Sequence, residues 1–228
     1  MWNSERDLQL WEEIAQEAHS RHSRKSGLYV GLLTDVERHA HQLIADKARG
    51  SKRVLEIGIG GGEHLVFRHS DTGTERYVGL DLSPVYAEIC ERKFGVKVVV
   101  ADAGRMPFED AAFDCVIAVA ILEHVENLAT VLAEIERVLE PGGRFLAAIP
   151  TNGSLAVGAF KAVMTYPTMR RRGIRRPDLV WHHLNVNCFK RVRSLLLQRF
   201  PATAQVAVPF RWLPWRLSPL WALLATKK

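Results

Sequence analysis

The apolar positions of the chain form short continuous runs that alternate with amphipathic stretches. The continuous runs predict five buried strands, at residues 52–57, 77–80, 96–100, 113–119 and 144–149. Strands that are apolar on both faces and alternate with helices are typical of a parallel sheet that is covered on both sides. The first two thirds of the chain therefore predict an α/β fold.

Start and stop signals place helices around these strands. An amphipathic helix is expected at residues 4–24, and Gly27 follows it. A second helix is expected to begin at Thr34, because Glu37 completes a capping-box pattern, and to run to about residue 49. Ser83 before Pro84 predicts a helix over residues 85–94, since a hydroxyl cap followed by proline is a common helix start. A further helix is expected at residues 128–139, ended by Pro141 and two glycines.

The pattern changes after Pro150. Residues 151–180 read as irregular and basic, followed by a helix at 189–200 and two strands at 203–208 and 220–226. The expected fold is a Rossmann-like, doubly wound α/β domain with a seven-stranded, mostly parallel sheet. In this interpretation residues 1–50 form a helical cap, residues 51–228 form the main domain, and residues 151–180 form a basic lid inserted after the fifth strand.

Composition excludes several classes of protein. The chain has 228 residues, of which 47% are hydrophobic and 25% charged, so it can bury a core, and disorder is excluded. Cys90, Cys115 and Cys188 are widely spaced, which fits a reducing compartment and predicts no metal site. The acidic start is unlike a signal peptide, and no apolar run approaches the ~20 residues of a membrane-spanning helix. A cytoplasmic location is expected.

Charge divides the chain into two unlike parts. Residues 1–150 contain 17 basic and 24 acidic residues, whereas residues 151–228 contain 14 basic residues and the single acid Asp178. Such an asymmetry indicates different partners for the two parts, although an uneven solvated surface gives the same numbers.

A glycine-rich turn follows the first predicted strand. Gly58, Gly60 and Gly62 permit the positive φ values of a tight turn and the close approach of a ligand. A dinucleotide fingerprint needs a further glycine where this chain has Glu63, and an acid there repels a pyrophosphate. Together with Glu56 in the strand, Glu63 favours a ligand of net positive charge, such as S-adenosylmethionine.

Acidic residues also follow the next two strands. Asp81 lies where a carboxylate accepts hydrogen bonds from two ribose hydroxyls, and Ser83 already accounts for the helix cap. Asp102 stands in the equivalent place after the third strand, where it can accept from an adenine amino group. Leu82 and Met106 are candidates to sandwich the ring, with plain core packing as the alternative for each.

These segments resemble a known family. VLEIGIGGG, GLDLS, ADAGRMPF, FDCVIAVAILEHV and LEPGGRFLAAIP occur in the order and spacing of the class I S-adenosylmethionine-dependent methyltransferases, and look most like the small-molecule subfamily. The resemblance covers residues 50–150 closely and the last two strands more loosely. It implies that Glu56 and the glycines 58 to 62 hold the methionine end and that Asp81 holds the ribose. By the same resemblance Asp102 and Ala103 hold the adenine, and residues 118–120, with Val119 at their centre, lie beneath the methionine.

The acceptor is less clearly marked. An Asn/Asp-Pro-Pro-Tyr motif, usual for methylation of amino groups in DNA or glutamine, is absent after the fourth strand. Glu123 and His124 are similar to the same positions in quinone-pathway O-methyltransferases, but Ala120 replaces the metal-binding Glu of some of those enzymes. His124, His182 and His183 are the candidate catalytic bases, because an unperturbed histidine titrates near neutral pH.

The lid suggests a partner. Arg170 to Arg172, Arg175 and Arg176 lie near an apolar stretch, a pattern that fits an anionic membrane surface or a lipid-linked phosphate, or else a lid that only covers the pocket. The expected function is S-adenosylmethionine-dependent O-methylation of a small-molecule or lipid-linked, anionic acceptor, with peripheral contact at the inner membrane surface. The alternatives are an RNA or protein methyltransferase and a catalytically silent, cofactor-binding subunit. No RNA-reading module is visible, so nucleic acid is disfavoured as a partner.

Overall fold

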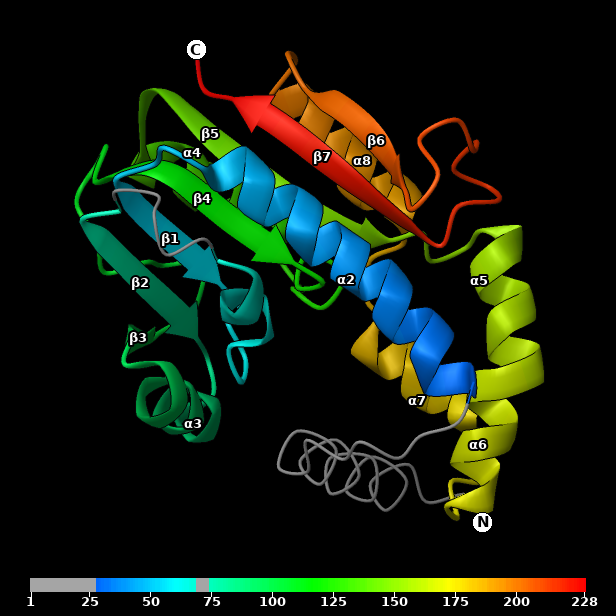
Figure 1. The fold of residues 1–228 in the computed structure, drawn as a ribbon. Helices are drawn as coiled ribbons and strands as arrows, with labels where there is room; N and C mark the ends of the chain where they lie inside the picture. Colours follow the sequence, from blue (N-terminus) through cyan, green and yellow to red (C-terminus); the bar gives the residue numbers. More distant parts are fainter. Residues whose placement is uncertain (1–27, 69–73) are drawn as a thin grey trace.

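Seven strands form one sheet in the order β3-β2-β1-β4-β5-β7-β6 (Figure 1). The computed structural model describes residues 28–68 and 74–228, with side chains in the first helix from residue 35 onwards; the helix predicted at residues 4–24 lies outside this range. Only β7 runs antiparallel to its neighbours, β5 and β6. The strands are β1 (Arg53–Ile57), β2 (Arg76–Asp81), β3 (Lys97–Val100), β4 (Phe113–Val119), β5 (Leu139–Pro150), β6 (Ala204–Val208) and β7 (Leu220–Thr226).

Helices cover both faces of this sheet (Figure 1). Those that follow the first strand are the 3-10 helix η1 (Glu63–Phe67), α3 (Pro84–Phe94), α4 (Leu128–Val138), α5 (Leu155–Phe160), the π-helix η2 (Lys161–Thr165), α6 (Tyr166–Arg171), α7 (Pro177–Leu184) and α8 (Phe189–Arg199). Helix α2 (Leu28–Ala48) packs on one face through Ala40 and Ile44, both fully buried. The described part of the predicted N-terminal cap is thus one of the sheet's covering helices, and a boundary at residue 50 stays a prediction.

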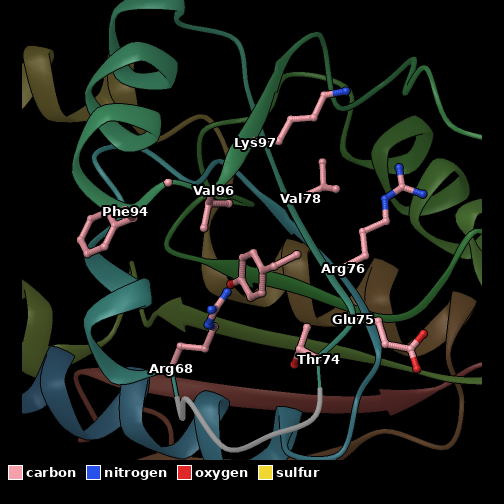
Figure 2. Close-up of a pocket in the computed structure, with 10 residues that line it drawn as sticks. Arg68, Thr74, Glu75, Arg76, Val78, Phe94, Val96 and Lys97 are labelled. Atoms are coloured by element: carbon pink, nitrogen blue, oxygen red, sulfur yellow. The ribbon is translucent and has the colours of Figure 1, made fainter.

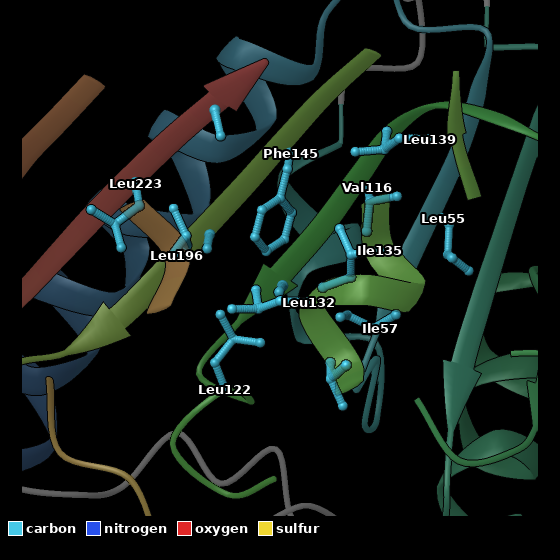
Figure 3. Close-up of a cluster of buried hydrophobic side chains, with 14 of the residues drawn as sticks. Leu55, Ile57, Val116, Leu122, Leu132, Ile135, Leu139, Phe145, Leu196 and Leu223 are labelled. Atoms are coloured by element: carbon cyan, nitrogen blue, oxygen red, sulfur yellow. The ribbon is translucent and has the colours of Figure 1, made fainter. Parts of the chain in front are cut away.

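The main hydrophobic core lies on the opposite face. Helices α4 and α8 bury Leu132, Ile135 and Leu196 against Phe145 of β5 and Leu223 of β7 (Figure 3). Side chains alternate along each strand, so β1 directs Leu55 and Ile57 into this core while Val54 faces α2. The predicted seven-stranded, mostly parallel, Rossmann-like sheet is confirmed.

The strand order places a ligand site at one edge of the sheet. From β1 the chain proceeds outward through β2 to β3, then crosses back to β4 on the other side of β1. The carboxyl ends of β1 and β4 therefore lie at a topological switch point, where the two connections diverge and leave a crevice. Strands β1 to β4 all end at this edge, and the segments that follow them begin there.

Two predicted boundaries are wrong. Helix α2 already includes Leu28, so Thr34 lies inside the helix and cannot be its N-cap. Helix α4 ends at Val138, and Pro141 and the glycines lie within β5 instead of ending the helix. Gly142 has a φ of +79°, and the register of β4 against β5 shifts between Phe113 and Cys115, so the irregular residues form a bulge in a longer strand.

The predicted irregular lid is mostly helical. Ser154 caps α5 by accepting a hydrogen bond from the Val157 N–H at 3.1 Å, and the helix continues through η2 into α6. Pro167 lies in α6, where its ring lacks an N–H and conflicts with the preceding turn. The π-helical turn η2 stands directly before it and widens the backbone there, which lets the helix pass the proline. Met169, Ile174 and Val180 form a small core of this segment.

Candidate cofactor and acceptor site

The glycine turn after β1 needs glycine for steric reasons. Gly58, Gly60 and Gly62 have φ values of +63°, +55° and +84°. A Cβ on Gly58 would lie 2.5 Å from Cγ1 of Ile121, closer than any real contact, so the backbone of the turn and the segment after β4 touch directly. Only glycine permits this approach.

Asp81 joins this turn to the end of β2. Its Oδ2 accepts a hydrogen bond from the Gly60 N–H at 2.9 Å, and its Oδ1 accepts one from the Ser83 N–H at 2.9 Å. The cap of α3 is Ser83, as predicted, since its hydroxyl accepts from the Tyr86 N–H. An ionised carboxylate has about four acceptor sites, so Asp81 keeps capacity for hydroxyl donors of a ligand.

Apolar side chains are exposed around this carboxylate. Leu82, directly after Asp81, is 73% exposed, and Val100 at the end of β3 is 50% exposed. Exposed apolar side chains beside a polar anchor are typical of a ring-binding site. Val100 carried no motif and was missed in the sequence analysis. Met106, by contrast, is buried in the main core.

Asp102 lies after β3, as the motif order predicts. Its Oδ1 accepts the Gly104 N–H at 2.8 Å, which fixes a tight turn while the side chain remains exposed. Ala103 in the same turn and Val119 at the end of β4 are both half-buried. These residues follow neighbouring strands that end at the edge where Asp81 lies.

Acidic groups surround the glycine turn. A Cβ on Gly61 would meet Oε1 of Glu63 at 2.8 Å, so this carboxylate lies over the turn itself. Glu56 is buried in β1, where the Tyr77 hydroxyl donates a 2.5 Å hydrogen bond to its Oε2. Burial, opposed by that hydrogen bond and aided by the charge of Glu63, raises the pKa of Glu56 to about 8. A bound cation lowers such a pKa again, since it favours the charged carboxylate.

The half-buried His41 and the buried His64 hold the turn from the side of α2. Nδ1 of His41 in α2 lies 3.1 Å from Nδ1 of His64 in η1, and the Phe67 ring stacks on His41. Burial lowers the pKa of His41 to about 4 and that of His64 to about 3, so both are neutral near pH 7 and one donates to the other. This contact fixes η1, and therefore the glycine turn, against α2.

The segment after β4 begins with a strained residue. Ala120 has a φ of +51°, which non-glycine residues rarely adopt, and its N–H donates to the Ala148 carbonyl at 2.8 Å. Strain of this kind concentrates where a loop must hold a ligand in one geometry. An alanine gives no signal of positive φ, so the sequence could not show it.

His124 is fixed by the end of α7. Its Nδ1 lies 2.6 Å from the Leu184 carbonyl oxygen, which can only accept, so Nδ1 carries the proton and Nε2 keeps a free lone pair. Nε2 lies 3.7 Å from Oε1 of the buried Glu123. His182 and His183 occupy the last turn of α7, both exposed, directly before Leu184. The structure thus brings the three predicted histidines to one part of the molecule.

Two buried oxygens near this histidine have no partner among the residues described. They are Oε2 of Glu123 and Oδ1 of Asn152. The Nδ2 of Asn152 donates to Asn185 at 2.8 Å, and the N–H of Asn187 donates to the Glu123 carbonyl at 3.0 Å, so one segment links both groups. Burial raises the pKa of Glu123 to about 7. Asn152 was missed; its only signal was a polar residue two positions after the end of β5.

A polar groove elsewhere is unrelated to these groups. It has a volume of about 420 Å³ and lies at the amino ends of β2 and β3, where Arg68, Arg76 and Lys97 line it with Glu75 (Figure 2). The carboxyl ends of the same strands carry Asp81 and Asp102, so the groove and the candidate site lie at opposite ends of the sheet.

Comparison with known proteins agrees with this geometry. Residues 55–147 match the model of a family described as a methyltransferase domain. Residues 55–147 therefore form a methyltransferase domain, with the fold of the class I S-adenosylmethionine-dependent enzymes. A solved S-adenosylmethionine-dependent methyltransferase from Thermotoga maritima has the same fold, with a TM-score of 0.64 and 18% identity over 97% of this chain and all of that one.

The chain also has curated relatives by sequence. A sterol 4-C-methyltransferase from Caenorhabditis elegans is 37% identical over half of this chain and 36% of its own. A phthiotriol/phenolphthiotriol dimycocerosates methyltransferase from Mycobacterium tuberculosis is 30% identical over 73% of this chain and 63% of its own. The chain therefore spans between about a third and two thirds of these two relatives.

The cofactor of this methyltransferase domain is S-adenosylmethionine. The residues present fit it: a turn that a Cβ would fill, a carboxylate with spare acceptor sites, and acids suited to a net positive ligand. Among the residues from 28 to 68 and from 74 to 228, no cluster of three or more His, Cys, Asp or Glu side chains is arranged to hold a metal ion.

Proposed function

We propose that this protein transfers a methyl group from S-adenosylmethionine to an oxygen atom of a lipid-type small molecule. The observation that carries the proposal is the hydrogen bond from the Gly60 N–H to Asp81, which joins two cofactor motifs at the switch edge of the sheet. When bound, the cofactor supplies an electrophilic methyl group on a sulfonium.

Three groups of side chains are assigned to the cofactor. Glu56 and the glycine turn hold the charged amino-acid end, for which the support is the acidic surroundings of that turn. Asp81 accepts from the ribose hydroxyls. The adenine is held by Asp102 and Ala103, with Leu82 and Val100 as apolar walls; for Met106 the buried position supports a core role beneath them. Val119 lies under the methionine.

The base that removes the acceptor proton is a histidine of the group that contains His124, His182 and His183. His124 has the strongest support, because the Leu184 carbonyl holds the proton on Nδ1 and leaves Nε2 able to accept one. Glu123, buried 3.7 Å away, is a positioning residue that stabilises the charged imidazole once Nε2 has taken the proton. The unpartnered oxygens of Glu123 and Asn152 are suited to a hydroxyl donor of the acceptor.

A lipid-type acceptor is supported by the relatives, whose names refer to a sterol and to phthiotriol dimycocerosates. An anionic acceptor, and contact of Arg170 to Arg176 with an anionic membrane, remain part of the proposal. Arg176 pairs with Asp178 at 2.7 Å, whereas Arg171, Arg172 and Arg175 are exposed and pair with no acid that the structure describes. Within the same described range, no helix combines the length and the apolarity needed to cross a bilayer.

The proposal is tested by incubating the purified protein with S-adenosylmethionine labelled in its methyl group. The acceptors are a panel of sterols and long-chain diols dispersed in detergent, beside an RNA pool and a peptide pool. Label recovered in the lipid phase as an ether that resists mild base supports the proposal. Label in RNA or peptide refutes it in favour of a macromolecular acceptor, and binding of cofactor without S-adenosylhomocysteine formation in any mixture indicates a silent subunit.

A further inference from the structure

We infer that one end of this protein, formed by residues 155–163 of the α5–η2 helix and residues 209–217 between β6 and β7, docks on an anionic lipid surface. We call it the docking edge. It differs from the Arg-rich segment of residues 170–176, at the end of α6 and after it, because its contact is made first by apolar and aromatic side chains and only then by charge.

The docking edge gathers exposed apolar side chains. Five of the ten large apolar side chains that the structure shows exposed lie on it. Trp212 is 79% exposed and Phe210 56%, with ring centroids 6.1 Å apart. Leu155 and Val163 on the helix and Leu217 on the loop are at least half exposed. Exposed large apolar side chains concentrated in two neighbouring segments mark a binding site more often than single exposed ones do.

Hydrogen bonds join the two segments of the edge. The N–H groups of Leu155 and Ala156, in the first turn of α5, donate to the Arg216 carbonyl at 3.1 and 3.3 Å. Figure 1 shows the loop before β7 beside the beginning of α5. These bonds place the end of the loop, at Arg216 and the exposed Leu217, beside the exposed Leu155 at the start of the helix.

The loop holds its shape through internal contacts. The Leu213 N–H donates to the Phe210 carbonyl at 3.1 Å, and the buried Ser218 hydroxyl lies within 3.0 Å of the Val208 and Leu220 carbonyls. The Trp215 ring packs 5.7 Å from Phe189 of the main core. Because the loop is already ordered, little conformational entropy is lost when it binds.

Charge selects a lipid surface as the occupant. Arg211, next to Trp212 in the chain, and Arg216, whose guanidinium lies 5.8 Å from the centroid of the Trp215 ring, are both exposed. Asp178 is the single acid of residues 151–228 and is already paired with Arg176. Aromatic side chains surrounded by basic ones are typical of proteins that lie at the interface of an anionic bilayer. A second copy of this chain fits poorly, because a twofold contact would place the arginines of one copy against the arginines of the other, and these like charges repel.

The position of the edge is consistent with a lipid acceptor. Ser154, the N-cap of α5, lies two residues after Asn152, whose Oδ1 has no partner among the described residues and lies in the candidate acceptor site. A membrane at the docking edge therefore adjoins that site. Lipid binding itself does not depend on methyl transfer, so its test stands even if the proposed reaction is wrong.

The test is sedimentation of the full chain, without cofactor, with sucrose-loaded vesicles. One set is phosphatidylcholine alone, and the other contains about one third phosphatidylglycerol to supply negative charge. We expect binding to the anionic vesicles, and at least ~10-fold weaker binding after Phe210→Ser combined with Trp212→Ser. Val66→Ser, which removes an apolar side chain 60% exposed on η1, is the matched control and should bind like the wild type.

A second measurement separates insertion from surface adsorption. Lipids brominated on their acyl chains quench tryptophans that enter the bilayer, and Trp212→Phe should abolish most of the quenching while it preserves the binding. Arg211→Gln with Arg216→Gln should weaken binding about fivefold for each charge removed.

Three results would overturn the inference. The first is that the Phe210→Ser/Trp212→Ser variant binds vesicles as well as the wild type does. The second is that the wild type binds neutral and anionic vesicles equally. The third is that the wild type binds no vesicles but forms a dimer, which Trp212→Ser converts to a monomer. The last result identifies the edge as a protein interface. Unchanged circular dichroism and S-adenosylmethionine affinity show that each variant is folded.

Discussion

The carboxylate of Asp81 and the backbone N–H of Gly60 lie 2.9 Å apart, although they belong to different cofactor motifs. The contact fixes the glycine turn and, at the same time, orients the carboxylate that is assigned to the ribose. The two motifs therefore act as one unit, and a change at Asp81 affects the turn as well as the ribose.

Asp81→Ala tests this unit directly. The variant loses charge-assisted hydrogen bonds that contribute about 1.5–3 kcal/mol each, so we expect S-adenosylmethionine to bind at least ~10-fold more weakly in calorimetry. Glu88→Gln, on the exposed face of α3, is the control for loss of one negative charge and should leave the affinity unchanged. Unaltered affinity in Asp81→Ala would remove Asp81 from the cofactor site.

Gly58→Ala tests the close approach of the turn to Ile121. The added Cβ meets that side chain at 2.5 Å and also forces alanine into a positive φ. We expect a loss of about 1–3 kcal/mol in the free energy of unfolding and a weaker cofactor site, measured by denaturant titration and calorimetry. Gly95→Ala separates the effect of backbone strain from that of the clash, because Gly95 also has a positive φ but has open space around it. This variant should retain full cofactor affinity.

The raised pKa of Glu56 predicts that a proton is released when the cofactor binds. At pH 7 the free protein holds a neutral carboxyl, since its pKa is about 8, and the ammonium group of a bound ligand favours ionisation. Calorimetry at pH 7 in buffers of different ionisation enthalpy should show a net release that approaches one proton. Glu56→Gln should release no proton when the cofactor binds. If the variant and the wild type release protons equally, the ammonium group of the cofactor lies elsewhere.

The same carboxyl makes stability depend on pH. Its folded pKa of about 8 lies above the ordinary value of 4.5, so between these values the unfolded chain gives up the proton first and stability falls as pH rises. Glu56→Gln retains an acceptor for the Tyr77 hydroxyl but cannot ionise. Its melting temperature should therefore exceed that of the wild type at pH 8 and match it near pH 4.5; a constant difference across this range would contradict the assignment.

The histidine variants identify the base. His124→Gln should lower turnover by ~100-fold while cofactor affinity stays near that of the wild type. Wild-type activity should rise as the pH increases through about 7, because Glu123 then ionises and stabilises the charged imidazole. Glu123→Gln should remove this limb of the profile. If the fall in turnover appears in His182→Gln or His183→Gln instead, the base lies on α7.

Much of this architecture could be predicted from the sequence because it rests on local signals. The apolar run of β4 and the proline after Ser83 define their elements without help from distant residues. The prediction that residues 151–180 are irregular was wrong because local signals mislead there. Pro167 indicates a break in the helix, and only the π-helical turn before it keeps the helix continuous.

Some residues of the site could likewise be predicted from local signals, and others could not. Asp81 and the glycines stand in motifs whose chemistry can be inferred directly, whereas the proton position on His124 depends on Leu184, sixty residues further along the chain. Likewise, Glu123 and Asn152 become notable only because folding buries an oxygen of each without a partner among the described residues. Contacts of this kind have no signature in a single sequence.

The strand order has a consequence for how the chain folds. β7 lies between β5 and β6 but follows both in the sequence, so β6 has no neighbour in the sheet until residues 220–226 have been synthesised. Until then the main-chain donors and acceptors of β5 and β6 are exposed as unpaired edges, which are prone to aggregate. Loss of this last strand, though it removes few residues, would thus open the sheet in its interior rather than shorten it at its margin.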